Sequence, residues 1–163
     1  MTVEAPLNLW RGVILPDWID HNGHMNVAYY TLIFDHAVDA LWEFIGVGET
    51  YRSNGTGSTF AVEQHITWDR EVMEGDPVRI ESRILGYDEK RIHHYHEMFH
   101  ADDGFCAATS SFLSLHVDLS SRRVAPMPVS VGDRLAEIWE THKDLPRPAK
   151  ADSAIRTTVP PAG

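Results

Sequence analysis

The sequence predicts an α+β domain in which one long helix is buried against an antiparallel β-sheet of about five strands. Three observations lead to this fold class. Residues 27–45 repeat apolar side chains at steps of three and four, the period of a helix with one buried face. Four β-rich segments follow between residues 59 and 117, and short turns join them. Strands do not alternate with helices, which argues against a sheet built from βαβ units.

The first elements are a short strand at residues 9–15, ended by Pro16, and the long helix. Asn26 is the expected N-cap of this helix and Gly46 is its expected C-cap. The stripe expected to be buried contains Val27, Tyr30, Phe34, Ala37, Val38, Leu41, Phe44 and Ile45, and the polar stripe contains Thr31, Asp35, Asp39 and Glu43. Residues 48–58 are rich in turn formers and predict an exposed connection.

The strand at residues 59–68 alternates between two faces. One face is expected to carry Phe60, Val62, Gln64, Ile66 and Trp68, and the other Thr59, Ala61, Glu63, His65 and Thr67. Further strands are expected at residues 78–87, 91–100 and 105–117, and a C-terminal helix at residues 130–142. We expect a single domain over residues 1–145 and a Pro- and Ala-rich, largely unstructured tail over residues 146–163.

Composition narrows the class of protein. The formal net charge of −10 argues against nonspecific binding of nucleic acid, which requires a basic face. No apolar run reaches the roughly 20 residues of a membrane span, and no signal-peptide pattern opens the sequence. Cys106 is the single cysteine, so an internal disulfide is impossible, and we expect a buried structural thiol. A cytoplasmic protein without nucleic-acid or membrane partners is the resulting expectation.

Several common kinds of site have no signature here. The sequence contains neither a G-x-S-x-G elbow nor a P-loop. His93, His94, His96 and His100 crowd one strand, but alternation separates the first from the others, so we expect hydrogen-bonding histidines and no metal. The notable basic clusters are either plain surface charges or phosphate contacts: Lys90 and Arg91 at a hairpin tip, Arg70, and Arg122 with Arg123.

The loop at residues 16–26 is the strongest indication of function. It places titratable and amide side chains directly before the positive end of the long helix. This arrangement suits an anion or a developing oxyanion. Asp20 is the nearest carboxylate to the helix, whereas Asp17 is interpreted as a turn residue. A solvated turn that merely caps the helix is the alternative.

The segment Asp20-His21-Asn22-Gly23-His24-Met25-Asn26 resembles the D-x-x-G-H-x-N motif of hotdog-fold acyl-CoA thioesterases of the 4-hydroxybenzoyl-CoA thioesterase type. The likeness extends through FAVEQHITWDREVMEGDPV and LGYDEKRIHHYHEM to about residue 128. The segments DWIDHNGHMN, VEQHI and DEKRIHHYH look most like betainyl-CoA thioesterases. The resemblance implies a hotdog fold, in which a curved sheet wraps a long central helix, and a homodimer or homotetramer with sites at the dimer interface.

The resemblance also assigns roles to residues. Asp20 acts as a nucleophile or as a base on water, and the backbone N–H of Val27 is the oxyanion donor. Gly23 lets the backbone approach the substrate, while Asn22, His24 and Asn26 orient the loop or the water. Glu63 is a possible second acid with His65 beside it, although the two are equally well explained as a buried structural pair. CoA is part of the substrate, Lys90 and Arg91 are its expected contacts, and no cofactor is implied.

Aromatic residues near the loop suggest the substrate. Trp18, Tyr29, Tyr30 and Trp68 flank the segments expected to face it, and Asp17, Asp35 and Glu63 lie in the same segments. Aromatic faces beside carboxylates favour a quaternary ammonium, although aromatics in helices and strands usually belong to the core. Two other functions compete with a thioesterase, namely a hotdog hydratase and a noncatalytic acyl-CoA sensor. The sequence does not match the usual His-and-Asp loop of a hydratase, and it shows no DNA-binding segment of the kind that a sensor normally needs.

Overall fold

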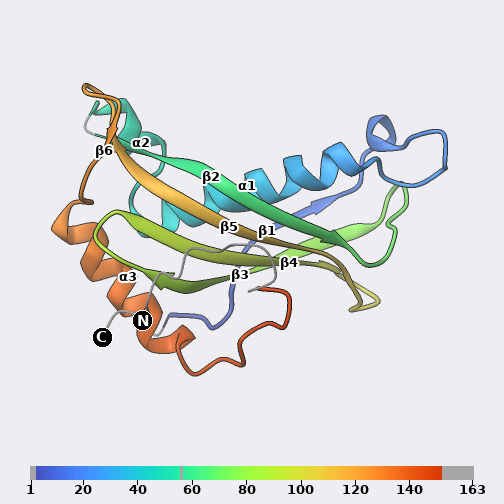
Figure 1. Cartoon of the computed structure of the whole chain (residues 1–163). Helices are drawn as coiled ribbons and strands as arrows, with labels where there is room; N and C mark the ends of the chain where they lie inside the picture. The colour runs from blue at the N-terminus through green and yellow to red at the C-terminus, as the bar shows by residue number, and fades with distance from the viewer. Residues whose placement is uncertain (1–2, 56, 152–163) are drawn as a thin grey trace.

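The computed structural model describes residues 3–55 and 57–151 and confirms the α+β class. Its main sheet is antiparallel, with the strand order β1-β3-β4-β5-β2, and β6 pairs with β5. The strands are β1 (Leu7–Val13), β2 (Gly57–Trp68), β3 (Pro77–Tyr87), β4 (Arg91–His100), β5 (Cys106–Asp118) and β6 (Arg123–Val124). Figure 1 shows the sheet curving, with α1 running along one of its faces.

Helix α1 (Val27–Ile45) has the predicted ends, because both caps are local features of the sequence. The Asn26 side chain accepts a hydrogen bond from the Ala28 N–H, and Gly46 takes a left-handed conformation with φ of 98°. The helix is 19 residues long and buries one face, as its apolar period predicts. Two members of the predicted stripe differ, because Val27 is 56% exposed and Phe44 is only half-buried. The buried residues are Tyr30, Ile33, Phe34, Ala37, Val38, Leu41, Trp42 and Ile45.

Shorter helices flank the sheet. A 3₁₀ turn, η1 (Pro16–Trp18), precedes the loop, and α3 (Val129–His142) begins one residue before its predicted start. The segment predicted as a plain connection contains a short helix, α2 (Glu49–Ser53), which sequence reasoning missed because its turn formers lie around it rather than within it. Among the described residues, no helix combines the length and apolar character that crossing a bilayer requires.

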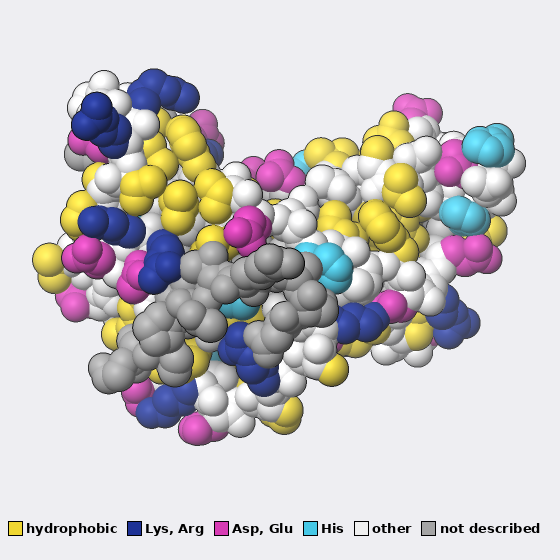
Figure 2. Space-filling model, in the orientation of Figure 1, with side chains coloured by type: hydrophobic (Ala, Val, Ile, Leu, Met, Phe, Trp, Pro, Cys, Tyr) yellow, Lys and Arg dark blue, Asp and Glu magenta, His cyan; other side chains and the backbone are white. Residues whose placement is uncertain are grey.

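Strand β2 forms one edge of the sheet, and no strand among the described residues pairs with its outer side. Register shifts between Ala61 and Glu63, so a bulge at Val62 interrupts the simple alternation predicted for this strand. Phe60 is 36% exposed and Val62 is 50% exposed, although both are large apolar residues. Figure 2 shows hydrophobic side chains gathered over the upper part of this face, where β2 and β6 run in Figure 1.

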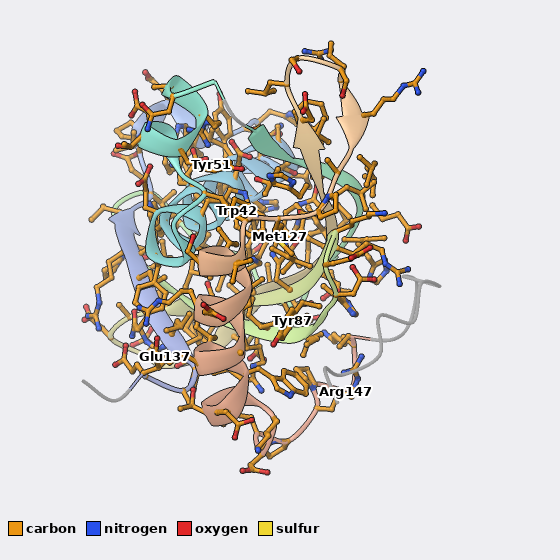
Figure 3. The ribbon with its side chains drawn as sticks, turned by 90° about the vertical axis from the view of Figure 1, so that its left-hand side faces the viewer. Trp42, Tyr51, Tyr87, Met127, Glu137 and Arg147 are labelled. Atoms are coloured by element: carbon orange, nitrogen blue, oxygen red, sulfur yellow. The ribbon has the colours of Figure 1, made fainter. Side chains whose placement is uncertain are left out.

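The chain after α3 returns across the outer face of the sheet, which is the face turned away from α1. Arg147 Nη1 donates to the carbonyl of Leu85 at 3.3 Å, and Ala151 is fully buried. Figure 3 shows Arg147 beside the sheet, in the segment that follows α3. Residues 146–151 are therefore held against the sheet through Arg147 and Ala151, although Pro146 and Ala149 are exposed, and this differs from the free tail expected. The rest of that tail, residues 152–163, lies outside the described residues, and the predicted domain boundary stays a prediction.

Two histidines of β4 lie in the core between α1 and the sheet. His94 Nδ1 and His96 Nε2 share a 2.8 Å hydrogen bond, and both residues are fully buried. His94 Nε2 reaches Ser114 Oγ at 2.9 Å and His96 Nδ1 reaches Ser82 Oγ at 2.8 Å, so every ring nitrogen has a partner. Burial, with the neighbouring His96 and His93, lowers the pKa of His94 well below its usual value. Burial lowers the pKa of His96 to about 3. The prediction of hydrogen-bonding histidines is confirmed.

Candidate active site

The loop before α1 folds into a tight reversal. Ile19 and Met25 form an isolated antiparallel bridge, and the Asp20 N–H donates to the carbonyl of His24 at 3.1 Å. The Gly23 N–H donates back to the Asp20 carbonyl at 3.0 Å, and Gly23 has φ of +81°. A side chain is strained at that φ, so glycine suits the turn. The reversal places Asp20 and its amide neighbours at the start of the helix.

Asn26 connects the Asp20 carboxylate to the helix. Its Nδ2 donates to Asp20 Oδ2 at 3.4 Å, while its Oδ1 accepts from the Ala28 N–H at 2.9 Å. The other oxygen, Asp20 Oδ1, accepts from the Asn22 N–H at 2.8 Å. Asp20 is half-buried, so its carboxylate stays accessible to water while these bonds hold its position. Sequence reasoning placed these three residues together, and the structure does so.

The backbone of Val27 meets the geometric requirement for an anion donor. Val27 is the first residue of α1, and within residues 3–55 and 57–151 no acceptor is found for its N–H. The neighbouring Ala28 N–H is already used by Asn26. Unpaired N–H groups at a helix start carry the positive end of the helix dipole and stabilise negative charge. The Val27 side chain is 56% exposed, which leaves this position open to a ligand.

A hollow of about 170 Å³ opens beside the start of α1. The loop and the segment after β2 form it together, and the Met25 N–H donates to the Val72 carbonyl at 3.0 Å, which joins the two. Its lining residues are His24, Met25, Val27, Tyr30, Trp68, Asp69, Arg70 and Glu71. His24 Nε2 lies 3.7 Å from Glu71 Oε2 across the hollow. Three predicted site residues, His24, Val27 and Trp68, therefore meet here.

Trp18 and Tyr29 lie elsewhere, which corrects the prediction of one aromatic pocket. Their rings stack on each other with centroids 5.5 Å apart. Tyr29 is two residues after Val27, so the two side chains leave α1 about 200° apart. Trp68 lines the hollow with Val27 and Tyr30, whereas Trp18 does not line it and packs on Tyr29. Only Tyr30 and Trp68 of the predicted aromatic set reach the hollow.

Glu63 and His65 also lie apart from the loop. Gln64, which lies between them, points to the inner face, where α1 packs: its side chain donates to Ser110 Oγ at 3.1 Å. Ser110 pairs with His96 of β4, and the His96 ring lies 6.4 Å from the Phe34 ring of α1. Because side chains alternate along a strand, Glu63 and His65 point to the outer face. Glu63 is exposed and His65 is half-buried, so the interpretation as a buried structural pair is wrong. Within one chain, neither approaches Asp20.

Lys90 and Arg91 lie at the opposite end of the sheet from the loop (Figure 1). Arg91 pairs with Leu115 of β5, whereas Trp68 pairs with Ala108. Seven residues of strand correspond to about 23 Å. Arg91 Nε also donates to Asp88 Oδ2 at 2.6 Å. Partial burial raises the pKa of Asp88, but hydrogen bonds from Lys90 and Arg91 outweigh burial, so this pKa lies below its usual value.

The chief residue that sequence reasoning missed is Glu71, with Asp69 beside it. Both follow Trp68 in the segment TWDREV, directly after β2 ends. Charged residues immediately after an aromatic strand end were the available signal. Cys106, by contrast, matches its expected structural role, because burial raises the pKa of its thiol to about 11. The ring of Phe105, the residue before Cys106, is covered by the Arg70 guanidinium at 3.8 Å.

Residues 14–135 match the family model of the thioesterase-like superfamily. The chain is a member of this superfamily. The betainyl-CoA thioesterase of Pseudomonas aeruginosa PAO1 is 37% identical over 142 residues, which is 87% of this chain and 89% of that protein. The L-carnitine dehydrogenase/betainyl-CoA thioesterase of Agrobacterium fabrum C58 is 36% identical over 94% of this chain, which spans 31% of that longer protein.

Solved structures show the same fold for this thioesterase-like chain. A Staphylococcus aureus protein solved in complex with CoA superposes with a TM-score of 0.82. The alignment covers 91% of this chain and 94% of that one at 24% identity, so this likeness shows the fold alone. The curved antiparallel sheet and its buried helix therefore have the hotdog-like arrangement that the resemblance implied. Family membership favours a thioesterase over the hydratase and sensor alternatives.

Proposed function

We propose that the protein is an acyl-CoA thioesterase that hydrolyses betainyl-CoA to betaine and free CoA. The observation that carries the proposal is the connection from the Asp20 carboxylate through Asn26 to the start of α1, where the Val27 N–H is open. A carboxylate and an oxyanion donor held together are the two groups that thioester hydrolysis needs. The names of the relatives from Pseudomonas and Agrobacterium support the choice of acyl group.

The reaction runs through a tetrahedral intermediate. The thioester oxygen accepts from the Val27 N–H, and the positive end of α1 stabilises the charge that develops on that oxygen. Asp20 either takes a proton from the attacking water or attacks the carbonyl itself, which gives an anhydride that water then opens. In both routes the C–S bond breaks and the CoA thiolate leaves and is protonated. Water is the only co-reactant, so no cofactor is proposed.

Finer assignments belong to the same proposal. The D-x-x-G-H-x-N loop, with its acid before the helix rather than on it, favours the 4-hydroxybenzoyl-CoA thioesterase type. Asn22, Gly23 and His24 orient the loop around Asp20. We also place the protein in the cytoplasm, because a single cysteine fits a reducing compartment. Lys90 and Arg91 are proposed to contact CoA phosphates, which their distance from the loop permits only across a subunit interface.

A homodimer supplies that interface. The edge strand β2 exposes backbone hydrogen-bonding groups together with Phe60 and Val62, an edge that proteins rarely leave uncovered. Antiparallel pairing of two β2 strands extends the sheet through a two-fold axis. One chain is then reversed relative to the other, which brings the hairpin with Lys90 and Arg91 toward the loop end of the partner. A tetramer would pair two such dimers.

The proposal is tested by thiol release from a panel of acyl-CoA esters. Asp20→Asn is expected to keep the fold and to lower turnover of betainyl-CoA at least about a hundredfold, as loss of an acid–base group should. Asp17→Asn is the matched control, because Asp17 is an exposed acid of the preceding turn. A folded Asp20→Asn protein with near-normal turnover, or a wild type that hydrolyses no ester of the panel, would overturn the proposal.

A further inference from the structure

The hollow beside α1 contains one carboxylate that remains available to a ligand. Asp69 forms an ion pair with Lys150, and Arg70 is stacked on the Phe105 ring. Glu71 has a side chain that is 64% exposed, and its contact with His24 Nε2 is 3.7 Å, longer than a hydrogen bond. Glu71 therefore adds an exposed carboxylate to the lining of the hollow.

The rest of the hollow is aromatic and apolar. Trp68 is 52% exposed, so its ring offers a face to a ligand. Tyr30 is almost completely buried, and its hydroxyl is bonded to the Val72 backbone, which leaves its ring as part of the wall. Met25 and Val27 complete the apolar surface. An aromatic face with a nearby carboxylate is the environment that attracts a quaternary ammonium, which has charge but no hydrogen to donate.

We propose that Glu71 and Trp68 form the subsite for the trimethylammonium group of the substrate, which makes them the specificity-determining residues of the site. This inference rests on the proposed betainyl-CoA thioesterase activity. Val27 connects the reaction centre to this subsite, because its N–H is the proposed oxyanion donor and its side chain lines the hollow. In a betainyl ester a single carbon separates the carbonyl from the ammonium nitrogen. A carbonyl bound at the Val27 N–H therefore places the ammonium group in the adjoining hollow.

The subsite is tested by comparing two esters of the same shape. The quantity measured is kcat/KM for betainyl-CoA divided by kcat/KM for the uncharged 3,3-dimethylbutyryl-CoA. Glu71→Gln removes the charge and keeps the volume, and it is expected to lower this ratio roughly 1.5- to fivefold, the effect of an exposed ion pair. Trp68→Leu is expected to lower the ratio roughly two- to thirtyfold, whereas Trp68→Phe keeps most of it because an aromatic face remains.

Controls separate this subsite from a structural role. Glu74→Gln removes an exposed carboxylate of the same connection that does not line the hollow, and it should keep the wild-type ratio. A Glu71→Gln protein that slows both esters equally would overturn the inference, because a structural role lowers both together. A wild type that hydrolyses both esters without preference would also overturn it and leave the thioesterase proposal standing. A wild type inactive on every ester would refute the proposed function itself.

Discussion

Asn26 performs two functions that substitution can separate. Its Oδ1 caps α1 through the Ala28 N–H at 2.9 Å, and its Nδ2 positions the Asp20 carboxylate at 3.4 Å. Asn26→Ala removes both, and loss of an N-cap costs about 1 kcal/mol of unfolding free energy. For a chain of 163 residues, that cost lowers Tm by about 2–4 °C. Asn26→Ser retains a capping oxygen and loses only the donor to Asp20, so its Tm should stay close to that of the wild type.

Both variants should lose turnover to a similar extent. The bond from Asn26 to Asp20 is long, and the carboxylate keeps its bond from the Asn22 N–H, so we expect a loss equivalent to about 0.5–1.5 kcal/mol, or roughly two- to tenfold in kcat. Thermal unfolding followed by circular dichroism gives Tm, and thiol release gives kcat. Wild-type kcat in Asn26→Ser would refute the positioning role, and an unchanged Tm in Asn26→Ala would refute the capping role.

Two further predictions concern stability and assembly. His94 and His96 stay neutral in the folded protein because their pKa values are lowered, that of His96 to about 3, whereas the unfolded chain binds protons near the ordinary value of 6.5. The free energy of unfolding should therefore fall as pH drops from about 6.5 toward 5, by up to about 1.4 kcal/mol per pH unit for each histidine. Urea titrations at pH 7 and pH 5 measure this fall. A His94→Gln/His96→Gln protein whose unfolding free energy depends equally steeply on pH would contradict the prediction. Val62→Lys places a charge on the exposed edge of β2 and should give monomers in light scattering. Val129→Lys is the control, because it alters a residue of α3 that is 80% exposed, and it should leave the dimer intact. A monomeric wild type would disprove the dimer.

The pair of core histidines shows how composition and position act together. An isolated buried histidine leaves ring nitrogens unsatisfied, which costs free energy. Here Ser82 and Ser114 lie at the two ends of the histidine pair, so each neutral ring can donate one proton and accept one. The serines lie on β3 and β5, whereas the histidines lie on β4. They meet because the strand register pairs His96 with Ser82 and Ile92 with Ser114. The polar core therefore depends on the alignment of β3, β4 and β5.

The predicted site was visible in the sequence where its parts are near neighbours. Asp20, Asn26 and Val27 fall within eight residues of one another, and the cap that orients them is formed by adjacent backbone and side-chain groups. For the same reason α1 begins and ends where the sequence predicts. The catalytic roles of these residues stay predictions, because the structure shows their placement and not their action.

Residues from distant segments were harder to place. The sequence allowed Trp18 and Trp68 to share one pocket, but in the structure Trp68 lines the hollow and Trp18 stacks on Tyr29 instead. Which side of a helix a neighbouring segment reaches depends on how the helix is rotated against the sheet, and that rotation is set by packing of the whole core. The exposed position of Glu63 on the outer face follows in the same way from the register of β2 against β5.

The sequence by itself determined the fold class, the ends of α1 and the loop with its carboxylate, because caps, turns and hydrophobic period act over a few residues. Tertiary structure alone decided that Glu71 and Trp68 adjoin Val27, although more than 40 positions separate them along the chain. It also decided that residues 146–151 cover the outer face of the sheet. Such contacts arise from long-range packing, whose geometry is the joint result of all strands and helices and is not encoded in any single segment.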